Sequence, residues 1–362
     1  MYSKLCGVYT IGGSNPNFRT IGEATDFLNK AGISCAVTLR IRNGTYNEQV
    51  TIDSVGGASH SNLITIESES GDSSKVTMST AGYVSGFRHT LKLNGTKHIR
   101  IKNISIAKYG SRDFYYGLEI SGNAYDVKIN NCQFNMLDAI GIYLSDQADS
   151  IYINNNFLSG NTLGTSNQHG YGIFDQSAGK IILQNNIITS FYYSGIYLSK
   201  KFARIGGNKI EKCRYGIDVY TSVEAQIINN VIQSNETGLR LSGTGQIVSN
   251  NKIEFKNRYG IDANVRKSII SNNWIYNQFN TDQNTTAAVR MLNCDSVKLL
   301  NNAMHLQVSE SNTNGLIIER GRKLWIENNI VSMKQTGLPV SILNVASELI
   351  ANRNVYYSSY LS

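Results

Sequence analysis

The sequence predicts an all-β solenoid, an elongated body built by stacking short repeated strands. A unit marked by Asn recurs in the middle of the chain at intervals of 22, 21 and 22 residues, at Asn208, Asn230, Asn251 and Asn273. Aliphatic residues recur at fixed offsets from this Asn, as Ile205 and Ile210 do around Asn208. One unit cannot bury a core alone but stacked copies can, so the period predicts a coil of about 22 residues.

The composition agrees with uninterrupted strands joined by turns. The chain has 362 residues, of which 2 are Pro and 32 are Gly. Pro removes a hydrogen bond from a sheet, whereas Gly and Asn suit turns. We expect an N-terminal strand and capping helix over residues 1–36 and one β-solenoid over residues 37–362. The last residues offer nothing that closes the stack, so we also expect further domains in a longer parent chain, or a partner that covers this end.

An amphipathic helix is predicted near the N-terminus. Thr20 followed by Glu23 is a capping-box pattern, and apolar residues then recur at helical spacing until Gly32. These apolar residues are Ile21, Ala24, Phe27, Leu28 and Ala31. Such a helix can cover the first coil and block pairing with another chain. The alternative is a helix that binds a partner.

A resemblance to a known class of proteins begins where the pattern changes to the strand period of two, near residue 37. The segment NGTYNEQVTI, Asn43–Ile52, resembles the GTYxExVxI opening of pectin-lyase-like right-handed parallel β-helix proteins. The longer segment Gly7–Ile52 is similar to the start of β-helix domains in secreted and cell-surface proteins of Bacteroidetes-type bacteria. The resemblance covers about an eighth of the chain. It implies a right-handed parallel β-helix and export, and it carries no catalytic residue.

Further Asn residues continue the repeat at positions 103, 131, 156, 186, 302, 329 and 354. Asn tolerates a left-handed turn, and its amide can bond to the equivalent Asn one coil away, so we expect nearly all of them to be structural. The pairs also resemble the IxNN repeats of carbohydrate-binding and sugar-hydrolase β-helices. Longer intervals place four insertions at one point of the repeat, at 108–116, 159–170, 277–287 and 307–314. Insertions on one face of a solenoid often border its binding face.

The charge favours acidic partners. A formal net charge of +8 suits uronate-containing or sulfated glycans, or nucleic acid, of which we favour an acidic polysaccharide. Solubility alone is the plainer explanation. The chain has no run of about 18 apolar residues, the length that is needed to span a membrane. The sequence begins without a signal peptide, so the protein is either intracellular or cut at its mature boundary, and we expect the second, a secreted or cell-surface protein.

The five cysteines suggest at most one disulfide. Cys6 and Cys35 flank the N-terminal segment and are candidates for a bond. Cys132, Cys213 and Cys294 are expected to be small core or turn residues. No Cys and His cluster has the spacing of a zinc site.

The candidate functional surface is a column of outward side chains. In the recurring pattern Gly-h-x-h, where h is apolar, x points outward when its neighbours point inward. Coil by coil, x is Glu119, Tyr143, Phe174, Tyr197, Asp218, Arg240, Asp262, Arg290 and Ile317. Flat aromatic faces and charged groups suit a glycan. Alternatively, stacked aromatics protect the sheet, and the alternating charges form an ion-pair ladder worth up to about 1 kcal/mol per pair.

Two copies of a motif, CRYGID and NRYGID, sharpen this surface. They add Arg214, Tyr215, Arg258 and Tyr259 to the predicted substrate-binding residues, which are otherwise Glu119, Tyr143, Phe174, Tyr197 and Arg290. Asp218, Arg240 and Asp262 are the predicted catalytic residues.

Two reactions are considered for these three residues. The carboxylates of Asp218 and Asp262, two coils or about 9.6 Å apart, are near the upper limit for an inverting glycosidase. However, Arg240 between them would keep both ionised, which is wrong for a general acid. A lyase is easier: the carboxylates would hold Ca²⁺, the one candidate cofactor, against a uronate while Arg240 or a Lys removes the α-proton. Two carboxylates alone supply too few oxygens for Ca²⁺.

Motifs of individual enzyme families give no further support. Polygalacturonase-like hydrolases combine NTD, DD and GHG; here Asn280–Asp282 and His169 are isolated matches. Pectin methylesterase motifs beyond GTYxE and the DPHE signature of alginate epimerases are absent. Two hypotheses follow: a secreted polysaccharide-active enzyme, such as an acidic-glycan lyase or a glycoside hydrolase, and a non-catalytic adhesin or glycan-binding module. A tailspike-like trimer is a third and weaker one.

Overall fold

The computed structural model describes residues 2–80, 88–108, 115–160, 170–199, 202–277, 285–307, 313–334, 337–345 and 347–358. The chain divides into two compact units, residues 1–192 (unit 1) and residues 193–362 (unit 2). Short strands dominate both units, and equivalent strands of successive coils pair in parallel. The predicted all-β parallel solenoid is therefore confirmed.

The described residues of unit 1 form one α-helix, one 3₁₀ helix and eighteen strands. In order they are β1 (Leu5–Ile11), α1 (Ile21–Ala31), β2 (Ile33–Ile41), β3 (Gly44–Asn47), β4 (Val50–Ile52), β5 (Ile64–Ser68), η1 (Ser73–Lys75), β6 (Val76–Thr80), β7 (His89–Asn94), β8 (Lys97–Lys102), β9 (Ser105–Lys108), β10 (Tyr116–Ser121), β11 (Tyr125–Asn130), β12 (Gln133–Met136), β13 (Ile140–Leu144), β14 (Asp149–Asn154), β15 (Phe157–Ser159), β16 (Tyr171–Asp175), β17 (Ile181–Gln184) and β18 (Ile187–Thr189).

Unit 2 contains strands only among the residues that the structure describes. They are β19 (Ser194–Ser199), β20 (Ala203–Gly206), β21 (Lys209–Val223), β22 (Gln226–Ile228), β23 (Val231–Thr244), β24 (Ile247–Ser249), β25 (Lys252–Phe255), β26 (Tyr259–Arg266), β27 (Ile269–Ser271), β28 (Trp274–Asn277), β29 (Thr286–Leu292), β30 (Asp295–Leu300), β31 (Ala303–Leu306), β32 (Thr313–Glu319), β33 (Arg322–Glu327), β34 (Ile330–Met333), β35 (Leu338–Leu343), β36 (Ser347–Asn352) and β37 (Val355–Ser358).

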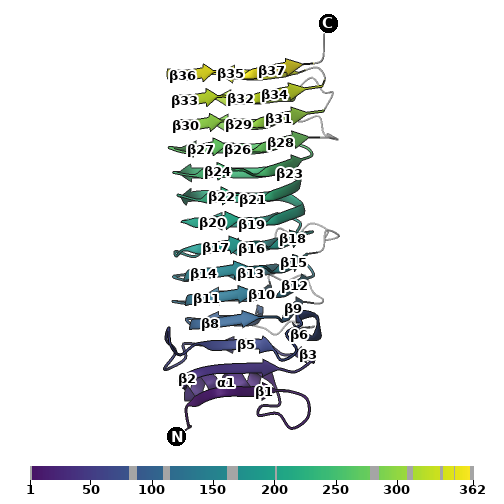
Figure 1. Cartoon of the computed structure of the whole chain (residues 1–362), viewed down its shortest axis with the longest axis vertical. Helices are drawn as coiled ribbons and strands as arrows, with labels where there is room; N and C mark the ends of the chain where they lie inside the picture. Colours follow the sequence, from purple (N-terminus) through teal and green to yellow (C-terminus); the bar gives the residue numbers. More distant parts are fainter. Residues whose placement is uncertain are drawn as a thin grey trace. The chain divides into compact units, whose positions relative to one another are not determined.

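The core of each unit is a column of aliphatic side chains inside the coils. Within unit 1, β10, β13 and β16 lie on successive coils, and Ile142 faces Leu118 on one side and Ile173 on the other (Figure 1). All three side chains are fully buried. Alternation along a strand sends every second residue inward, so the apolar positions of the Gly-h-x-h pattern build the core.

Glycine precedes these strands because successive coils approach too closely for a side chain. A Cβ added at Gly216 would lie 2.6 Å from the carbonyl oxygen of Gly238, and one added at Gly238 would lie 2.6 Å from that of Gly260. Such contacts are shorter than packing allows. The recurring Gly therefore follows from the backbone spacing between coils.

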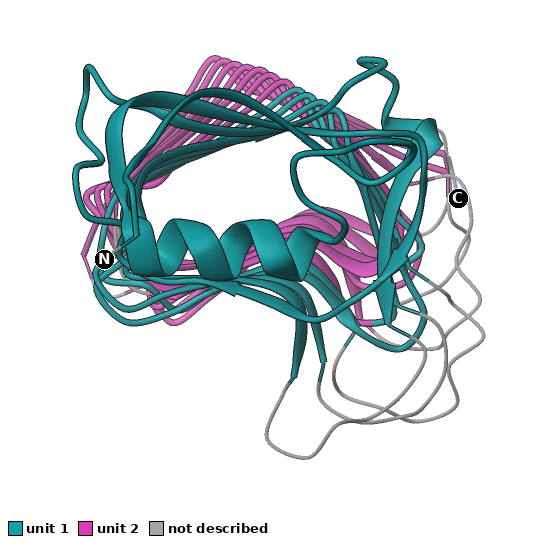
Figure 2. Cartoon of the chain, turned by 90° about the horizontal axis from the view of Figure 1, so that it is seen from below, with its two compact units in different colours: residues 1–192 teal, residues 193–362 magenta. Residues whose placement is uncertain are grey.

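The helix α1 begins and ends where the sequence predicts. The Thr20 hydroxyl accepts a hydrogen bond from Glu23 N (3.0 Å), and Gly32 follows the last turn at φ 68°. Figure 2 shows α1 lying across the coils of unit 1. The carboxylate of Glu48, from the GTYNE segment, accepts bonds from the backbone N–H groups of Ile21 (3.2 Å) and Gly22 (2.7 Å). A carboxylate at a helix N-terminus is favoured by the helix dipole, which explains why this segment needs its Glu.

The paired Asn residues divide two structural tasks between them. The first Asn of a pair takes the left-handed turn conformation, as Asn250 does at φ 56°. The second is buried and forms a ladder: the side-chain oxygen of Asn251 accepts bonds from the backbone N (2.9 Å) and the amide N (3.0 Å) of Asn230. In unit 2 the same bonds link Asn208, Asn230, Asn251, Asn273, Asn302, Asn329 and Asn354.

The sequence assignment of two early repeats needs correction. Asn103 and Asn131 adopt the left-handed turn conformation, at φ 56° and 54°, rather than the ladder position. In the second of these coils Cys132 takes the ladder position, where its backbone N donates to the Asn156 side-chain oxygen (2.9 Å). The sequence pattern did not distinguish the turn position from the ladder position, because Asn at either one recurs at nearly the same interval.

Cys6 and Cys35 form a disulfide that joins β1 to β2. This outcome confirms the candidate pairing. Cys132, Cys213 and Cys294 are free thiols and buried, as the sequence predicts. Burial raises the pKa of Cys132 to about 12 and that of Cys294 to about 11. Cys132 and Cys294 therefore stay protonated near neutral pH, which suits packing residues.

The four predicted insertions, at 108–116, 159–170, 277–287 and 307–314, lie largely outside the described residues, as do His169 and Asn280–Asp282. The prediction that they border the binding face remains a prediction.

Candidate functional site

The predicted outward column is present, but it is more buried than the sequence suggests. In unit 1 Glu119 lies opposite Tyr143 and Tyr143 opposite Phe174. In unit 2 the column runs through Tyr197, Asp218, Arg240, Asp262, Arg290 and Ile317. Most members are half-buried, while Asp218 is 1% and Ile317 4% exposed.

Both buried members have a physical explanation. Asp218 is short and stands between the longer side chains of Tyr197 and Arg240. Ile317 packs in an apolar cluster with Tyr259 and Ala287. An outward strand position therefore does not guarantee exposure, and Ile317 is not a ligand-facing residue.

The charged part of the column forms two bidentate ion pairs. Arg240 Nε donates to Asp218 Oδ1 (2.9 Å), and its Nη2 donates to Oδ2 of the same carboxylate. Arg290 Nε and Nη2 each donate to Asp262 at 2.8 Å. The charges therefore form two separate pairs rather than a continuous ladder, because Arg240 makes an ion pair with Asp218 and none with Asp262.

Each ion pair rests on a tyrosine of the repeated motif. The guanidinium carbon of Arg240 lies 4.3 Å from the ring centre of Tyr215, and that of Arg290 lies 4.4 Å from the ring centre of Tyr259. The two rings are 6% and 8% exposed. The guanidinium groups already cover a face of each ring, and the role of Tyr215 and Tyr259 as substrate-binding residues remains a prediction.

The two other motif residues bind a carboxylate that sequence reasoning missed. Arg214 Nε donates to Glu236 (2.6 Å), and Arg258 Nε lies 3.5 Å from the same carboxylate. The Tyr215 hydroxyl also donates to Glu236 (3.1 Å). The signal was present in the sequence, since Glu236-Thr237-Gly238 aligns with the two Arg-Tyr-Gly segments and reverses their charge.

A pocket of about 340 Å³ opens beside the ion pairs in unit 2. Its polar lining includes Arg240, Asp262, Arg290, Tyr220, Ser242 and Asn264. The last three were not predicted. They lie two residues after Asp218, Arg240 and Asp262, so continuing the outward alternation along each strand would have found them.

The ionisation of the pocket is governed by burial and pairing. Burial raises the pKa of Asp218, and the hydrogen bonds from Arg240 oppose that rise. Burial would lower the pKa of Arg240, but its bonds to Asp218 raise it above the ordinary value. Arg240 therefore stays charged in this arrangement, and its role as a lyase base remains a prediction.

The aromatic part of the column lies in unit 1. Tyr143 stacks on Tyr116 with ring centres 4.3 Å apart and on Phe174 at 5.7 Å. Burial raises the pKa of Tyr116 to about 12. Below the stack, Glu119 pairs with Lys92 (2.8 Å) and lies 3.5 Å from His89. Burial also raises the pKa of Tyr197, the aromatic member in unit 2.

The described residues contain no group of three or more His, Cys, Asp and Glu side chains able to hold a metal ion. In the pocket, both oxygens of Asp218 and of Asp262 already accept bonds from arginine. The predicted Ca²⁺ ligands therefore do not fit a calcium site by themselves. No helix in the described part of the chain is long and apolar enough to cross a membrane.

The fold and pocket define a parallel β-helix with a polar, arginine-rich site on its outer surface. Residues 89–253 match the family model described as the right-handed β-helix region. Residues 199–352 match the model of NosD, described as a periplasmic copper-binding protein. No curated protein sequence matches the chain.

Solved structures share the fold. XylC, in complex with xylose, is 11% identical with a TM-score of 0.58, covering 98% of this chain and 86% of its own. A DFA-IIIase variant from Arthrobacter chlorophenolicus A6 is 12% identical with a TM-score of 0.58, covering 97% and 99%. The periplasmic alginate epimerase AlgG is 14% identical with a TM-score of 0.52, covering 88% and 77%. The chain is a right-handed parallel β-helix protein, as the sequence resemblance predicts.

Proposed function

We propose that the protein recognises an acidic polysaccharide through the pocket beside the Asp218–Arg240 and Asp262–Arg290 ion pairs. The observation that carries this proposal is the arrangement of donors around a preformed hollow. Each arginine binds its aspartate through Nε and Nη2, and among the described residues Nη1 of Arg290 has no hydrogen-bonding partner. A guanidinium edge fixed by an ion pair and a tyrosine ring is well suited to a uronate carboxylate.

The rest of the lining suits sugar hydroxyl groups. Ser242 and Tyr220 carry hydroxyls, and Asn264 carries an amide that can donate and accept. Polysaccharide recognition is also compatible with the named relatives of this fold, which include an alginate epimerase and a xylose complex. The net charge of +8 favours an acidic chain over a neutral one.

The protein could also cleave the polysaccharide that it recognises, and cleavage is therefore the second candidate function. If it does not cleave, it is a non-catalytic adhesin or binding module. The buried, raised-pKa carboxyl of Asp218 beside the pocket is the observation that keeps cleavage in view. Recognition without cleavage is favoured by the bidentate pairing of both carboxylates.

The binding proposal is tested with pectate, alginate, chondroitin, ulvan and heparin oligosaccharides by titration calorimetry. Asn264→Ala removes a lining group without touching either ion pair, and we expect it to weaken binding by about three- to tenfold, the worth of one neutral hydrogen bond. Asn352→Ala, an exposed residue outside the pocket, is the matched control and should leave affinity unchanged.

Absorbance at the unsaturated-uronate band, recorded on the same mixtures with and without Ca²⁺, separates the two candidates. A flat trace together with measurable binding supports recognition without cleavage. A rising trace that Asn264→Ala slows establishes a lyase. Absence of binding to every member of the panel would overturn the proposed function.

We further propose that the chain works outside the cytoplasm, as a secreted, cell-surface or periplasmic protein. The Cys6–Cys35 disulfide supports this, because such bonds persist mainly in oxidising compartments. The match to a family described as periplasmic points the same way. Cell fractionation with free-thiol labelling checks it: a reduced, cytoplasmic protein would contradict the proposal.

We propose that the N-terminal part, residues 1–36, caps the β-helix and that the coils of this β-helix average about 22 residues. Ile21, Ala24 and Leu28 of α1 are buried, and Asn29 donates to Thr51 O of β4 (3.0 Å). A cap should protect the coil it covers. We expect Leu28→Asp to speed amide hydrogen exchange in β1, β2 and β4 while leaving unit 2 unchanged; slow exchange throughout would argue against capping.

A further inference from the structure

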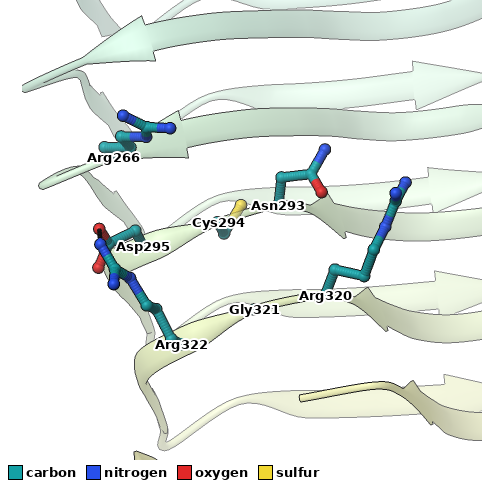
Figure 3. Close-up of a pocket in the computed structure, with 7 residues that line it drawn as sticks. All are labelled: Arg266, Asn293, Cys294, Asp295, Arg320, Gly321 and Arg322. Atoms are coloured by element: carbon teal, nitrogen blue, oxygen red, sulfur yellow. Dashed lines mark hydrogen bonds and ion pairs between the residues drawn. The ribbon is translucent and has the colours of Figure 1, made fainter. Parts of the chain in front are cut away.

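A second, smaller pocket in unit 2 is lined by more positively than negatively charged side chains. The pocket has a volume of about 160 Å³ and is lined by Arg266, Arg320, Arg322, Asn293 and Asp295 together with the backbone at Gly321 (Figure 3). It therefore holds three guanidinium groups against one carboxylate.

That carboxylate is already bound. Arg322 Nη2 donates to Asp295 Oδ2 at 2.6 Å, and this bond holds the pKa of Asp295 below its usual range. Within the described residues, neither Arg266 nor Arg320 makes an ion pair, although the charge of Arg266 adds to that of Arg322 in lowering the pKa of Asp295. Figure 3 shows them on opposite sides of Cys294, with Arg266 next to the Asp295–Arg322 pair and Arg320 beside Asn293.

The backbone holds Arg320 in a conformation that is unusual for arginine. Its φ is 55°, in the left-handed region, and the equivalent turn positions in the neighbouring coils are Asn293 at φ 52° and Asn344 at φ 56°. Asn suits that conformation better than Arg does. The guanidinium is thus placed at the pocket by a turn where asparagine would be the easier residue.

The small pocket continues the larger one along the same strand. On β26, alternate residues Asp262, Asn264 and Arg266 point outward; the first two line the larger pocket and the third lines the smaller. On the next coil Arg290 and Leu292 line the larger pocket, and Asn293 follows in the smaller. An extended ligand lying along these strands would meet both.

We infer that the Arg266–Arg320–Arg322 pocket is an oxyanion-binding site that takes the carboxylate or sulfate group of an acidic glycan. Guanidinium groups recognise both oxyanions through paired hydrogen bonds. As a glycan subsite, the inference rests on the proposed function; as an oxyanion site it stands independently of it. It adds a second anion-binding position, outside the larger pocket, to the one proposed at Arg290.

The test uses two variants and one matched control. Arg320→Asn removes the charge and introduces the residue found at this turn in the neighbouring coils. Arg266→Gln removes the second charge and keeps a polar side chain. Arg204→Gln is the control, because Arg204 is exposed on β20 and away from both pockets.

Inorganic sulfate is the first probe, added at constant ionic strength with chloride as balance and followed by thermal unfolding. We expect sulfate to stabilise the wild type and Arg204→Gln, and to lose its effect in Arg320→Asn and Arg266→Gln. Equal responses in all four proteins would overturn the oxyanion site whether or not any glycan binds.

Size-matched oligosaccharides are the second probe: oligogalacturonate, a heparin oligosaccharide, and their methyl-esterified and desulfated forms. Each variant should lose about tenfold in affinity for oligogalacturonate and little for its neutral methyl ester. For a sulfate ligand, each should lose about tenfold for heparin and little for the desulfated form, which keeps only carboxylates. Loss with oligogalacturonate alone identifies a carboxylate ligand, and loss with heparin alone a sulfate. Unchanged affinities in both variants, with binding intact, would overturn the subsite and leave the proposed function standing.

Discussion

Replacing Arg240 by Ala is expected to destabilise unit 2 by about 3–5 kcal/mol, because it leaves a buried carboxylate without its partner. The side chain of Asp218 is 2% exposed, so water cannot replace the lost hydrogen bonds. Urea unfolding of the isolated variant measures the loss. Asp218→Asn combined with Arg240→Ala should recover much of it, since the orphaned charge is then removed.

Arg258→Ala is the matched control in the same unit. The Arg258 side chain is 48% exposed and lies 3.5 Å from Glu236, so its removal should cost about 1 kcal/mol or less. Equal losses in Arg240→Ala and Arg258→Ala would show that the Asp218–Arg240 pair is not a buried one.

The penalty in Arg240→Ala should depend on pH in a defined direction. Burial raises the pKa of Asp218 in the folded state above its unfolded value, and the variant removes the arginine that opposes this rise. An acid whose folded pKa is raised costs stability above that pKa and costs nothing below the unfolded one. The difference between wild type and variant should therefore be largest at neutral pH and shrink as the pH falls through the carboxyl range.

Asn251→Ala should cost about 3–5 kcal/mol, as several buried groups lose their partners at about 1–3 kcal/mol each. The side-chain oxygen of Asn251 accepts two bonds from Asn230, and its amide N donates to Ile227 O (2.8 Å) and to Asn273 (2.9 Å). Alanine leaves the buried Asn230 N without its side-chain acceptor and removes the amide bonds to Ile227 O and to Asn273. Chemical denaturation followed by circular dichroism gives the loss.

The neighbouring residue Asn250 provides the contrast. It is exposed at φ 56°, a conformation that glycine adopts readily, so Asn250→Gly should change stability by about 0.5 kcal/mol or less. A similar loss in both variants would mean that the two positions of the pair do not differ in the way that their hydrogen bonds indicate.

The fold was predictable because the features that specify it are local and repeated. The spacing of Asn251 from Asn230 and Asn273, the Gly before each apolar strand and the capping signal at Thr20 all act through the backbone. Each was found where the sequence placed it. Which Asn of a pair takes the left-handed turn and which takes the buried ladder position was not predictable, since both positions accept the same residue.

The site was only partly predictable because side-chain coverage depends on neighbours one coil away. Asp218 was expected to point outward and Tyr215 to bind substrate, yet Arg240 contacts both and both are buried. Strand alternation gives the direction of a side chain but not what lies over it. The second outward position, represented by Asn264, was not predicted because it follows directly after the Gly-h-x-h pattern and is not part of it.

The asparagine ladder also has a consequence for how such a chain can change its length. Asn230, Asn251 and Asn273 use the same atoms toward the coil before and the coil after. A gene duplication or deletion that spans one whole coil therefore leaves every remaining rung with a suitable neighbour. Insertions between two ladder asparagines lengthen a turn without interrupting the ladder. The protein can therefore acquire new surface while the same Asn hydrogen bonds repeat in its interior.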